Sequence, residues 1–368
     1  MDRGAKGDGE ADDTTAFQSA IDEAGAGTVL VPAGTYRVST LKLRDDGCRL
    51  VGVSATALCK APFGSSAFNA SAYFAGSVVR CSDESGAGVL VAARGVGIEN
   101  LVVLGPGSGT SVGVKFATPS SAPQKNLIRN LHVGNFATGV SFQSCYFSHL
   151  DSVSVAGCGV GLHLKGSSNQ NVFTNTFVDH CGVGVLVADA SDLNLFNGGV
   201  IQNYRTSGFR AKDVGTCHNR ISSVYFESAY SGDAITAGVG ATQTAVEHCH
   251  FSGAEQTVTL AANACSFTWP DGAVRMVVGG YSCFLLGYFV HEPVSTRSTN
   301  DDTVIWNTRN NGSGLNVSGQ RIALGGVGNQ NRVGFYGATP TVKPSVETAD
   351  VKSVLAALVK LGLVSDNT

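Results

Sequence analysis

Hydrophobic positions along this chain repeat at a nearly constant interval from residue 96 to about residue 262. An early copy starts at Val96, and six further copies start at Asn126, Ser148, Asn171, Asn194, Asn219 and Thr244. The steps between these six starts are 22, 23, 23, 25 and 25 residues. Within each copy the apolar residues alternate as in strands, and no copy has room for a helix of about ten residues. The period therefore predicts an all-β solenoid, a right-handed single-stranded parallel β-helix.

Two columns of apolar side chains are expected to point into this β-helix. The first column is Ile128, Leu150, Phe173, Phe196, Ile221 and Val246. The second column, five residues further along each copy, is Val133, Val155, Val178, Ile201, Phe226 and Phe251. Side chains on either side of an inward strand position point outward, and successive coils lie about 4.8 Å apart. Outward residues at equivalent positions should therefore form columns on the surface.

Composition agrees with strands and tight turns, because the 368 residues include 47 glycines and only 14% are charged. A net charge of −3 gives no reason to expect a nucleic-acid partner or an anionic membrane. No apolar run reaches about 18 residues, so no membrane insertion is expected. The ten cysteines form no CxxC pair, which argues against a zinc ribbon. We expect mostly free thiols, with Cys158 and Cys181 stacked internally, and neither a metal nor a cofactor.

The N-terminal stretch "GDGEADDTTAF" is rich in carboxylates and leads into an amphipathic segment. Over Thr14–Ala24, the residues Phe17, Ala20, Ile21 and Ala24 form one apolar stripe, which predicts a short helix. Asp12, Asp13 or Thr14 is expected to cap its N-terminus. The following "GTVLVPAGTYRV" predicts a strand, a turn and a second strand.

This order of segments over residues 4–38 resembles the N-terminal region of the pectate-lyase-like superfamily, which includes bacteriophage tailspikes. The resemblance implies that the helix closes one end of the β-helix. It also implies that Asp8, Asp12 and Asp13 have a structural role and do not bind metal or take part in catalysis. The chain starts without the pattern of a signal peptide, so we expect either assembly in the cytosol or a fragment of a longer chain.

The C-terminal sequence "NRVGFYGATPTVKPSVETADVKSVLAALVKLGLVS" resembles the last segment of phage tail fibre and tail structural proteins. Thr348–Leu361 is predicted to be a helix whose apolar stripe needs a partner surface. In tailspikes that partner is the same helix of two other chains, which implies a homotrimer; the alternative is a helix folded back onto its own β-helix. We expect a cap with the first coil at 1–40, the β-helix at 41–293 and a C-terminal module at 294–368.

Candidate chemistry lies in the outward columns, since the sequence has no nucleotide-binding loop, HExxH or GxSxG motif. Asp179 and Glu227 occupy one outward column two coils apart, with Gln202 between them. Their backbones should lie about 10 Å apart, close to the spacing of acid and base in inverting glycosidases. We therefore predict Asp179 and Glu227 as catalytic. The predicted substrate-binding residues around them are Phe177, His180, Gln202, Asn203, Tyr204, Arg205 and Tyr225.

Three other placements of a site stay open at this point. One is a cluster of Glu247, His248 and His250 with Asp151. A second is a groove between subunits that uses acids of the longer turns, namely Asp189, Asp192, Asp213 or Asp233. A third is a lyase site in which a base and a cation act on a uronic acid, for which His180, Arg205 and Lys212 are available.

The leading hypothesis is a tailspike-like protein that recognises a bacterial surface polysaccharide and cleaves it by glycoside hydrolysis. The alternatives are a non-enzymatic tail structural or receptor-binding protein with the same fold, and a polysaccharide lyase. The expected partners are the polysaccharide, two copies of the same chain and other tail proteins. The expected location is the virion tail, assembled in the host cytoplasm and acting at the host surface.

Overall fold

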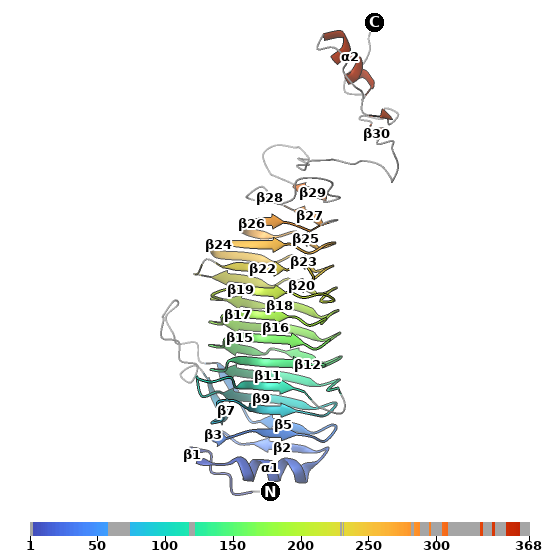
Figure 1. The fold of residues 1–368 in the computed structure, drawn as a ribbon. Helices are drawn as coiled ribbons and strands as arrows, with labels where there is room; N and C mark the ends of the chain where they lie inside the picture. Colours follow the sequence, from blue (N-terminus) through green and yellow to red (C-terminus); the bar gives the residue numbers. More distant parts are fainter. Residues whose placement is uncertain are drawn as a thin grey trace.

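The computed structural model describes residues 3–57, 74–117, 122–228, 230, 232–280, 283–287, 294–295, 304–307, 332–333, 341–342 and 351–360. Almost all of its strands join one continuous ladder of parallel coils, stacked from the blue N-terminal end to the orange C-terminal end in Figure 1. The predicted all-β parallel solenoid is therefore confirmed. Each coil contributes strands to three layers, which we call layers A, B and C in the order that the chain visits them.

Layer A contains the first strand segment of each coil, paired in parallel with the coils before and after it. Its strands are β2 (Thr28–Val31), β5 (Arg49–Gly52), the first half of β9 (Gly97–Leu104), the first half of β11 (Leu127–Gly134), β13 (His149–Asp151), the first half of β16 (Val172–Asp179), the first half of β18 (Leu195–Gln202), β20 (Arg220–Ser222), β23 (Ala245–Glu247), β25 (Ser266–Thr268), β27 (Phe284–Gly287) and β29 (Val304–Asn307).

Layer B follows layer A after a sharp bend, at which residues such as Asn130, Ser152 and Asn175 have positive φ. Asparagine and serine accept this left-handed conformation more readily than branched residues do. The strands of layer B are β1 (Asp8–Asp12), β3 (Gly34–Val38), β7 (Phe74–Cys81), the second halves of β9, β11, β16 and β18, β14 (Ser154–Ala156), β21 (Tyr225–Ser228) and the beginnings of β24 (His250–Leu260) and β26 (Asp271–Val278).

Layer C completes each coil, and a longer turn then leads back to layer A. Its strands are β4 (Leu41–Leu43), β8 (Ala87–Val91), β10 (Val112–Phe116), β12 (Thr138–Gln143), β15 (Val160–Lys165), β17 (Val183–Val187), β19 (Ser207–Ala211), β22 (Asp233–Ala237), the ends of β24 and β26, and β28 (Val294–Ser295). One further strand, β6 (Ala55–Ala57), runs antiparallel to β7 and lies outside the three layers.

The interior consists of the two apolar columns that the sequence predicts, and all twelve residues are buried. Aromatic rings stack from coil to coil, for example Phe173 on Phe196 with ring centroids 4.5 Å apart. A polar column also runs inside the turn from layer C to layer A. There, Asn171, Asn194 and Asn219 donate side-chain hydrogen bonds to one another or to nearby carbonyl groups. These bonds satisfy amides that would otherwise be buried at a cost.

The N-terminal helix α1 (Thr14–Ala24) closes the first coil and buries Phe17 and Ile21, as predicted. Asp13 occupies the N-cap position but makes no side-chain capping bond. Its two carboxylate oxygens instead accept hydrogen bonds from the backbone amides of Lys6 and Gly7. Asp12 accepts a bond from the amide of Thr14, so Asp12 and Asp13 have the structural role that the resemblance implies, and side-chain capping by Asp13 is wrong.

The C-terminal region continues the ladder and then changes character. β28 pairs with β26 and β29 pairs with β27, so parallel pairing extends past residue 293 to Asn307. β30 (Arg332–Val333) and β31 (Thr341–Val342) form an antiparallel pair, and α2 (Val351–Lys360) is the predicted C-terminal helix. Figure 1 shows α2 apart from the coils. The division at 293 and the trimer stay predictions.

Two further expectations concern the whole chain. Nine of the ten cysteines lie in the described segments, and all nine are free thiols, of which eight are buried. The expected internal column of Cys158 and Cys181 is present, since both side chains are buried in the core. No helix in the described ranges is long and apolar enough to cross a membrane.

Candidate functional site

The candidate acids lie in register on the outer surface of layer B. Asp179 of β16 pairs with Gln202 of β18, which pairs with Glu227 of β21, so the predicted outward column is confirmed. Two parallel steps separate the two acids, or about 10 Å along the axis. Both carboxylates are partly exposed. The column therefore offers two accessible acids on one rigid surface.

Asp179 is held by side chains of its own coil and the next one. Its Oδ1 atom lies 2.7 Å from Nδ1 of His180 and accepts a hydrogen bond of 3.0 Å from Nδ2 of Asn203. His180 and Asn203 both have φ near +50° at the turn from layer B to layer C, which brings their side chains alongside the acid. Only 13% of the Asp179 side chain is exposed. Asp179 is thus a mostly buried carboxylate whose orientation is fixed by His180 and Asn203.

Two predicted substrate contacts have other roles. Tyr204 is fully buried, and its hydroxyl donates to Oε1 of Gln256 inside the β-helix. Burial raises the pKa of Tyr204, chiefly by desolvation, and this residue belongs to the core. Its assignment as a substrate contact is wrong, because it follows the turn and the chain has already re-entered the interior. Asn203 is 2% exposed and positions Asp179, while Arg205 is exposed at the same turn.

A second outward column lies beside the acids on the same strands. It contains Phe177, Val200 and Tyr225, all half-buried, and it continues through His250 to Asp271. The Tyr225 ring stacks in parallel on His250 at 4.7 Å, and its hydroxyl donates to Oγ of Ser252. The Nδ1 atom of His250 lies 2.7 Å from a carboxylate oxygen of Asp271. From the sequence, this column was predicted only as far as Tyr225. Counting equivalent positions in the next two coils would have added His250 and Asp271.

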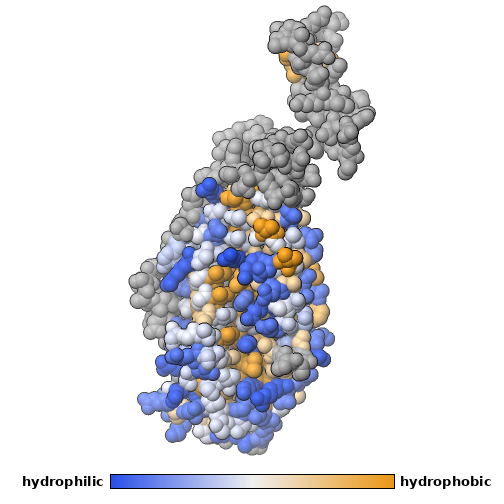
Figure 2. Space-filling view, viewed as in Figure 1, coloured by the Kyte–Doolittle hydropathy of each residue, from blue (hydrophilic) through white to orange (hydrophobic). Residues whose placement is uncertain are grey.

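Nearer the N-terminus the same column is covered. Val78 and Val102 of this column pack with Leu104 and Ala156 of the Asp179 column in a small apolar cluster against Ala55 of β6. His132 lies in this covered part, and burial lowers its pKa to about 4. The surface of layer B is therefore exposed at Asp8 and Arg37 on its first strands, covered around Val102 and His132, and open from Phe177 onward. Figure 2 shows apolar side chains in a discontinuous band along the coils, flanked by polar ones.

The cluster of Glu247, His248 and His250 with Asp151 does not form. Asp151 and Glu247 are four parallel steps apart in layer A, or roughly 19 Å. Glu247 is paired with Arg220, and Asp151 lies 3.6 Å from Arg129. These acids form ion pairs across coils and are not brought together.

The expected lyase set is only partly brought together. His180 and Arg205 share the turn from layer B to layer C, whereas Lys212 follows β19 at the end of layer C and lies 3.5 Å from Asp213. Lys212 is therefore not part of that group. Among the turn acids, Asp192 approaches Cys217 and His218, and Asp233 accepts a bond from Thr236.

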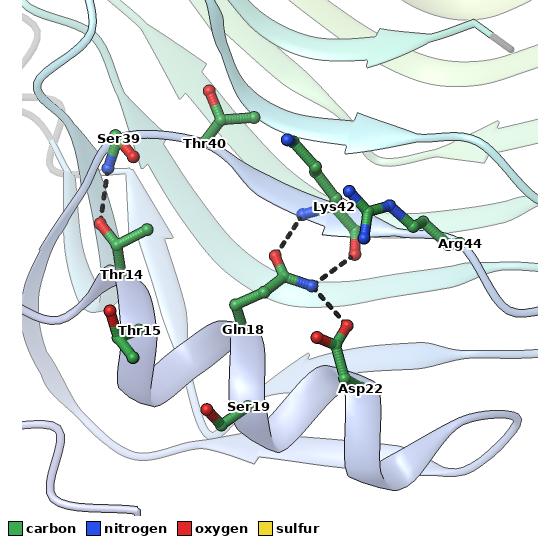
Figure 3. Close-up of a pocket in the computed structure, with 9 residues that line it drawn as sticks. All are labelled: Thr14, Thr15, Gln18, Ser19, Asp22, Ser39, Thr40, Lys42 and Arg44. Atoms are coloured by element: carbon green, nitrogen blue, oxygen red, sulfur yellow. Dashed lines mark hydrogen bonds between the residues drawn. The ribbon is translucent and has the colours of Figure 1, made fainter. Parts of the chain in front are cut away.

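Two cavities lined by described residues lie around α1. One of about 500 Å³ lies between α1 and β4 and is shown in Figure 3. Gln18 crosses it, with Oε1 accepting from the amide of Lys42 and Nε2 donating to the Lys42 carbonyl and to Asp22. A second cavity of about 730 Å³ is lined by residues such as Phe17 and Tyr36. These bonds fix α1 to the first coil, and the carboxylates of layer B lie elsewhere.

Family models match the chain in two consecutive parts. The model of the right-handed β-helix region matches residues 86–269, half of the chain. The chain belongs to the right-handed β-helix family. The preceding residues, 1–85, match the model of rhamnogalacturonase A/epimerase, pectate lyase-like. The pectate-lyase-like resemblance of the N-terminal region is thereby supported.

Similar curated proteins come from Azotobacter vinelandii. Mannuronan C5-epimerase AlgE5 is 58% identical over 50 residues, which is 13% of this chain and 5% of the epimerase. Alginate lyase 7 is 53% identical over 53 residues, 14% of this chain and 6% of the lyase. The matched segments therefore span only a small fraction of either relative.

Solved structures with the same fold include enzymes and viral proteins. The A-module of the A. vinelandii mannuronan C-5 epimerase AlgE4 has a TM-score of 0.55 at 17% identity, covering 83% of this chain and 98% of the module. ORF18 of Geobacillus virus E2 has a TM-score of 0.52 at 15% identity, covering 85% and 62%. The enzymatically active domain of tailspike protein 2 of bacteriophage CBA120 has a TM-score of 0.51 at 14% identity, covering 82% and 42%. At these identities the likeness concerns the fold alone.

Proposed function

We propose that this protein binds a polysaccharide along the open part of layer B and cleaves it there. The observation that carries the proposal is the register of Asp179, Gln202 and Glu227 on three successive coils. Beside this column, Tyr225 and Phe177 present aromatic groups to the same surface. Aromatic rings stack on the apolar faces of sugars, and carboxylates act on the glycosidic oxygen. A straight row of equivalent positions suits a polymer whose units repeat.

Hydrolysis with inversion is the reaction that this spacing suits best. Inverting enzymes hold their two carboxyl groups about 6.5–9.5 Å apart so that a water molecule fits between base and sugar. Asp179 and Glu227 start from backbones about 10 Å apart, and their side chains can close part of that distance. Oδ1 of Asp179 already accepts from Asn203, which leaves Oδ2 for the water. We assign Asp179 as the general base and Glu227 as the general acid.

A lyase or epimerase reaction is the second candidate, favoured by a separate observation. His180 contacts Asp179, and the backbone amide of Arg205 on the next coil donates to the carbonyl of Cys181, so a base and a cation occupy the same turn of adjacent coils. Removing a proton beside a uronate carboxylate needs both groups. The short matches to an alginate lyase and to mannuronan epimerases are consistent with this chemistry.

The biological setting that we propose is a phage tail, with the chain as a homotrimer in the virion acting on a bacterial surface polysaccharide. The shared fold with a tailspike domain and with a viral ORF18 supports it. Val354 and Leu355 of α2 are exposed, so this helix has an apolar face available for two further copies. A mass measurement in solution tests the trimer, and a monomer that persists at high protein concentration would contradict it.

The activity is tested with bacterial surface polysaccharides and with alginate as substrates. Hydrolysis predicts new reducing ends without ultraviolet absorbance, whereas a lyase forms an unsaturated product that absorbs. An epimerase changes the sugar configuration, seen by NMR, without shortening the chain. Asp179→Asn and Glu227→Gln should each remove activity, while Asp45→Asn at an exposed N-terminal turn should not. Binding without any of the three products would support the non-enzymatic receptor-binding alternative.

A further inference from the structure

The turn from layer C to layer A brings together three side chains that bind metal ions in other proteins. Asp192 lies at this turn on one coil, and Cys217 and His218 lie at the same turn on the next coil. One ligand atom from each residue lies within 4.8 Å of the other two. Asp179 lies at the turn from layer B to layer C, so this group is separate from the candidate polysaccharide site.

Backbone geometry explains how neighbouring residues can face one point. The amide of Leu193 donates to the carbonyl of Cys217, which fixes Asp192 and Cys217 at equivalent positions of adjacent coils. Parallel coils are about 4.8 Å apart, so equivalent side chains meet. His218 has φ of +52°, and this left-handed conformation turns its side chain to the side of Cys217. In an extended strand, consecutive side chains would point apart.

The turn also contains buried oxygen atoms whose hydrogen-bonding capacity is unused. Oδ1 of Asp192 and Oγ1 of Thr216 are both buried without a hydrogen-bond partner among the described residues. A buried carboxylate oxygen without a partner is costly, so such an atom usually has a donor or an ion beside it. This observation is independent of the cluster geometry and points to a cation at Asp192.

We propose that Asp192, Cys217 and His218 bind a zinc ion. The donor set of one thiolate, one imidazole and one carboxylate suits Zn²⁺ better than Ca²⁺ or Mg²⁺, which prefer oxygen atoms alone. Tetrahedral zinc needs donor atoms roughly 3.5 Å apart, so small side-chain rotations close the site. His218 is exposed and Cys217 is partly exposed, which leaves both free to rotate. Three protein ligands leave the fourth position for water.

Zinc binding requires that the thiol loses its proton. The S–H bond of Cys217 breaks, the sulfur keeps the electron pair and binds Zn²⁺, and the proton leaves to solvent, with no change of oxidation state. Without metal, burial and then the nearby charge of Asp192 raise the pKa of the Cys217 thiol. A divalent cation between these two groups compensates both effects. The ion would tie two adjacent coils together at this turn.

Aspartate, cysteine and histidine also occur together in catalytic sites in which a histidine activates a nucleophilic cysteine. Such a site needs a thiolate in the metal-free protein. The raised pKa of Cys217 opposes this role, as does the position of its acidic neighbour. Alkylation by iodoacetamide distinguishes the two roles, since a nucleophile reacts rapidly at neutral pH and a protonated thiol does not.

The test uses the full chain, without an affinity tag, after treatment with EDTA. Calorimetric titration with Zn²⁺ should show one ion per chain, and Co²⁺ should give a thiolate-to-cobalt charge-transfer absorption band. Cys217→Ser should abolish that band, and His218→Gln and Asp192→Asn should each weaken Zn²⁺ binding by more than about tenfold. Zn²⁺ should raise the Tm of the unaltered protein by more than it raises that of His218→Gln at the same Zn²⁺ concentration.

Two matched variants serve as controls. Cys59→Ser removes a thiol outside the described residues, and His149→Gln removes a histidine on layer A; both should bind Zn²⁺ as the unaltered chain does. His218 is exposed, so His218→Gln should fold even if Cys217→Ser does not. Absence of Zn²⁺ binding, binding that is equal in His218→Gln, or rapid alkylation at neutral pH that Zn²⁺ fails to prevent would overturn the proposal.

Discussion

The outer surface of layer B has a covered part and an open part, built from equivalent positions of successive coils. In the covered part, Val102 and His132 lie beneath β6 and are buried. In the open part, the same column continues as Val200, Tyr225 and His250, which are partly exposed. The parallel pairing of strands, its register and the inward apolar columns follow the same pattern in both parts. The difference arises from β6, a segment that runs antiparallel to the first residues of β7.

This comparison shows that an outward position in a β-helix has no fixed role. Under β6, apolar residues add a second small core to the main one. Beyond β6, the same positions can hold aromatic and polar groups for a ligand, because nothing in the described structure packs over them. The candidate acids Asp179 and Glu227 lie in this open part. We therefore expect stability to depend on the covered part and activity to depend on the open part.

The largest expected effect on stability comes from placing a carboxylate in the outward column of layer B, once in the covered part and once in the open part. Val102→Asp would bury an unpaired carboxylate beneath β6 and should destabilise the fold by about 3 kcal/mol or more. Val200→Asp would expose its carboxylate and should cost less than about 1 kcal/mol. Chemical denaturation measures both changes. Equal losses of stability would contradict the division into covered and open parts.

A pH effect of similar size is expected from His132. Its pKa is lowered to about 4, mainly by desolvation, from an ordinary value of 6.5. Because the folded state binds fewer protons, His132 stabilises the fold above pH 6.5, and this stabilisation is lost as the pH falls toward 4. The loss is up to about 3 kcal/mol, at 1.36 kcal/mol for each pKa unit. Thermal unfolding should show it.

His163 contributes in the same direction, since burial also lowers its pKa to about 4. The variant His132→Leu should therefore reduce the loss of stability between pH 6.5 and 4 without removing it. Asp8 and Asp12 have pKa values lowered by hydrogen bonds, from Ala11 and Thr14 respectively, so they act below this range. A pH dependence that is the same in His132→Leu would show that this histidine is not responsible.

A smaller effect on activity is expected from Asn203, which positions Asp179. Asn203→Ala removes the bond to Oδ1 of Asp179 and should lower kcat by about tenfold, equal to 1.4 kcal/mol, with little change in KM. The pH profile of kcat should shift as well, because the carboxylate loses a donor. Asn203→Asp is a useful comparison, since it keeps the size and removes the donor. An unchanged pH profile in both variants would exclude the positioning role.

The smallest effect is expected from the aromatic group at Tyr225. Tyr225→Ala removes a ring that stacks on His250 and should weaken polysaccharide binding by about 1 kcal/mol, or roughly fivefold in KM. Tyr225→Phe keeps the ring and loses only the bond to Ser252, so its KM should stay close to that of the unaltered chain. Equal KM values for the alanine variant and the unaltered chain would place the ligand elsewhere.

Most of the fold could be predicted from the sequence because each coil repeats one pattern of inward and outward positions. The columns of Ile128 and Val133, the helix α1 and the alignment of Asp179 with Glu227 follow from counting residues. Counting works here since parallel pairing places equivalent residues of successive coils beside one another.

The roles at the turns could not be predicted in this way. Tyr204 and Arg205 are neighbours in sequence, yet one is buried and the other exposed, because positive φ at Asn203 redirects the chain. The burial of His132 beneath β6 could not be predicted either, because β6 belongs to no repeat of the sequence. The same holds for Asp192, Cys217 and His218, whose meeting depends on the conformation of one turn.

The central claim is that carboxylates of the open part of layer B act on a polysaccharide. The most direct measurement compares product formation by the unaltered chain with that by Asp179→Asn and Glu227→Gln, once a cleaved polysaccharide has been found. Our account predicts losses of more than about 100-fold in both variants, with unfolding midpoints close to that of the unaltered chain. Full activity in either variant, with the fold intact, would contradict it.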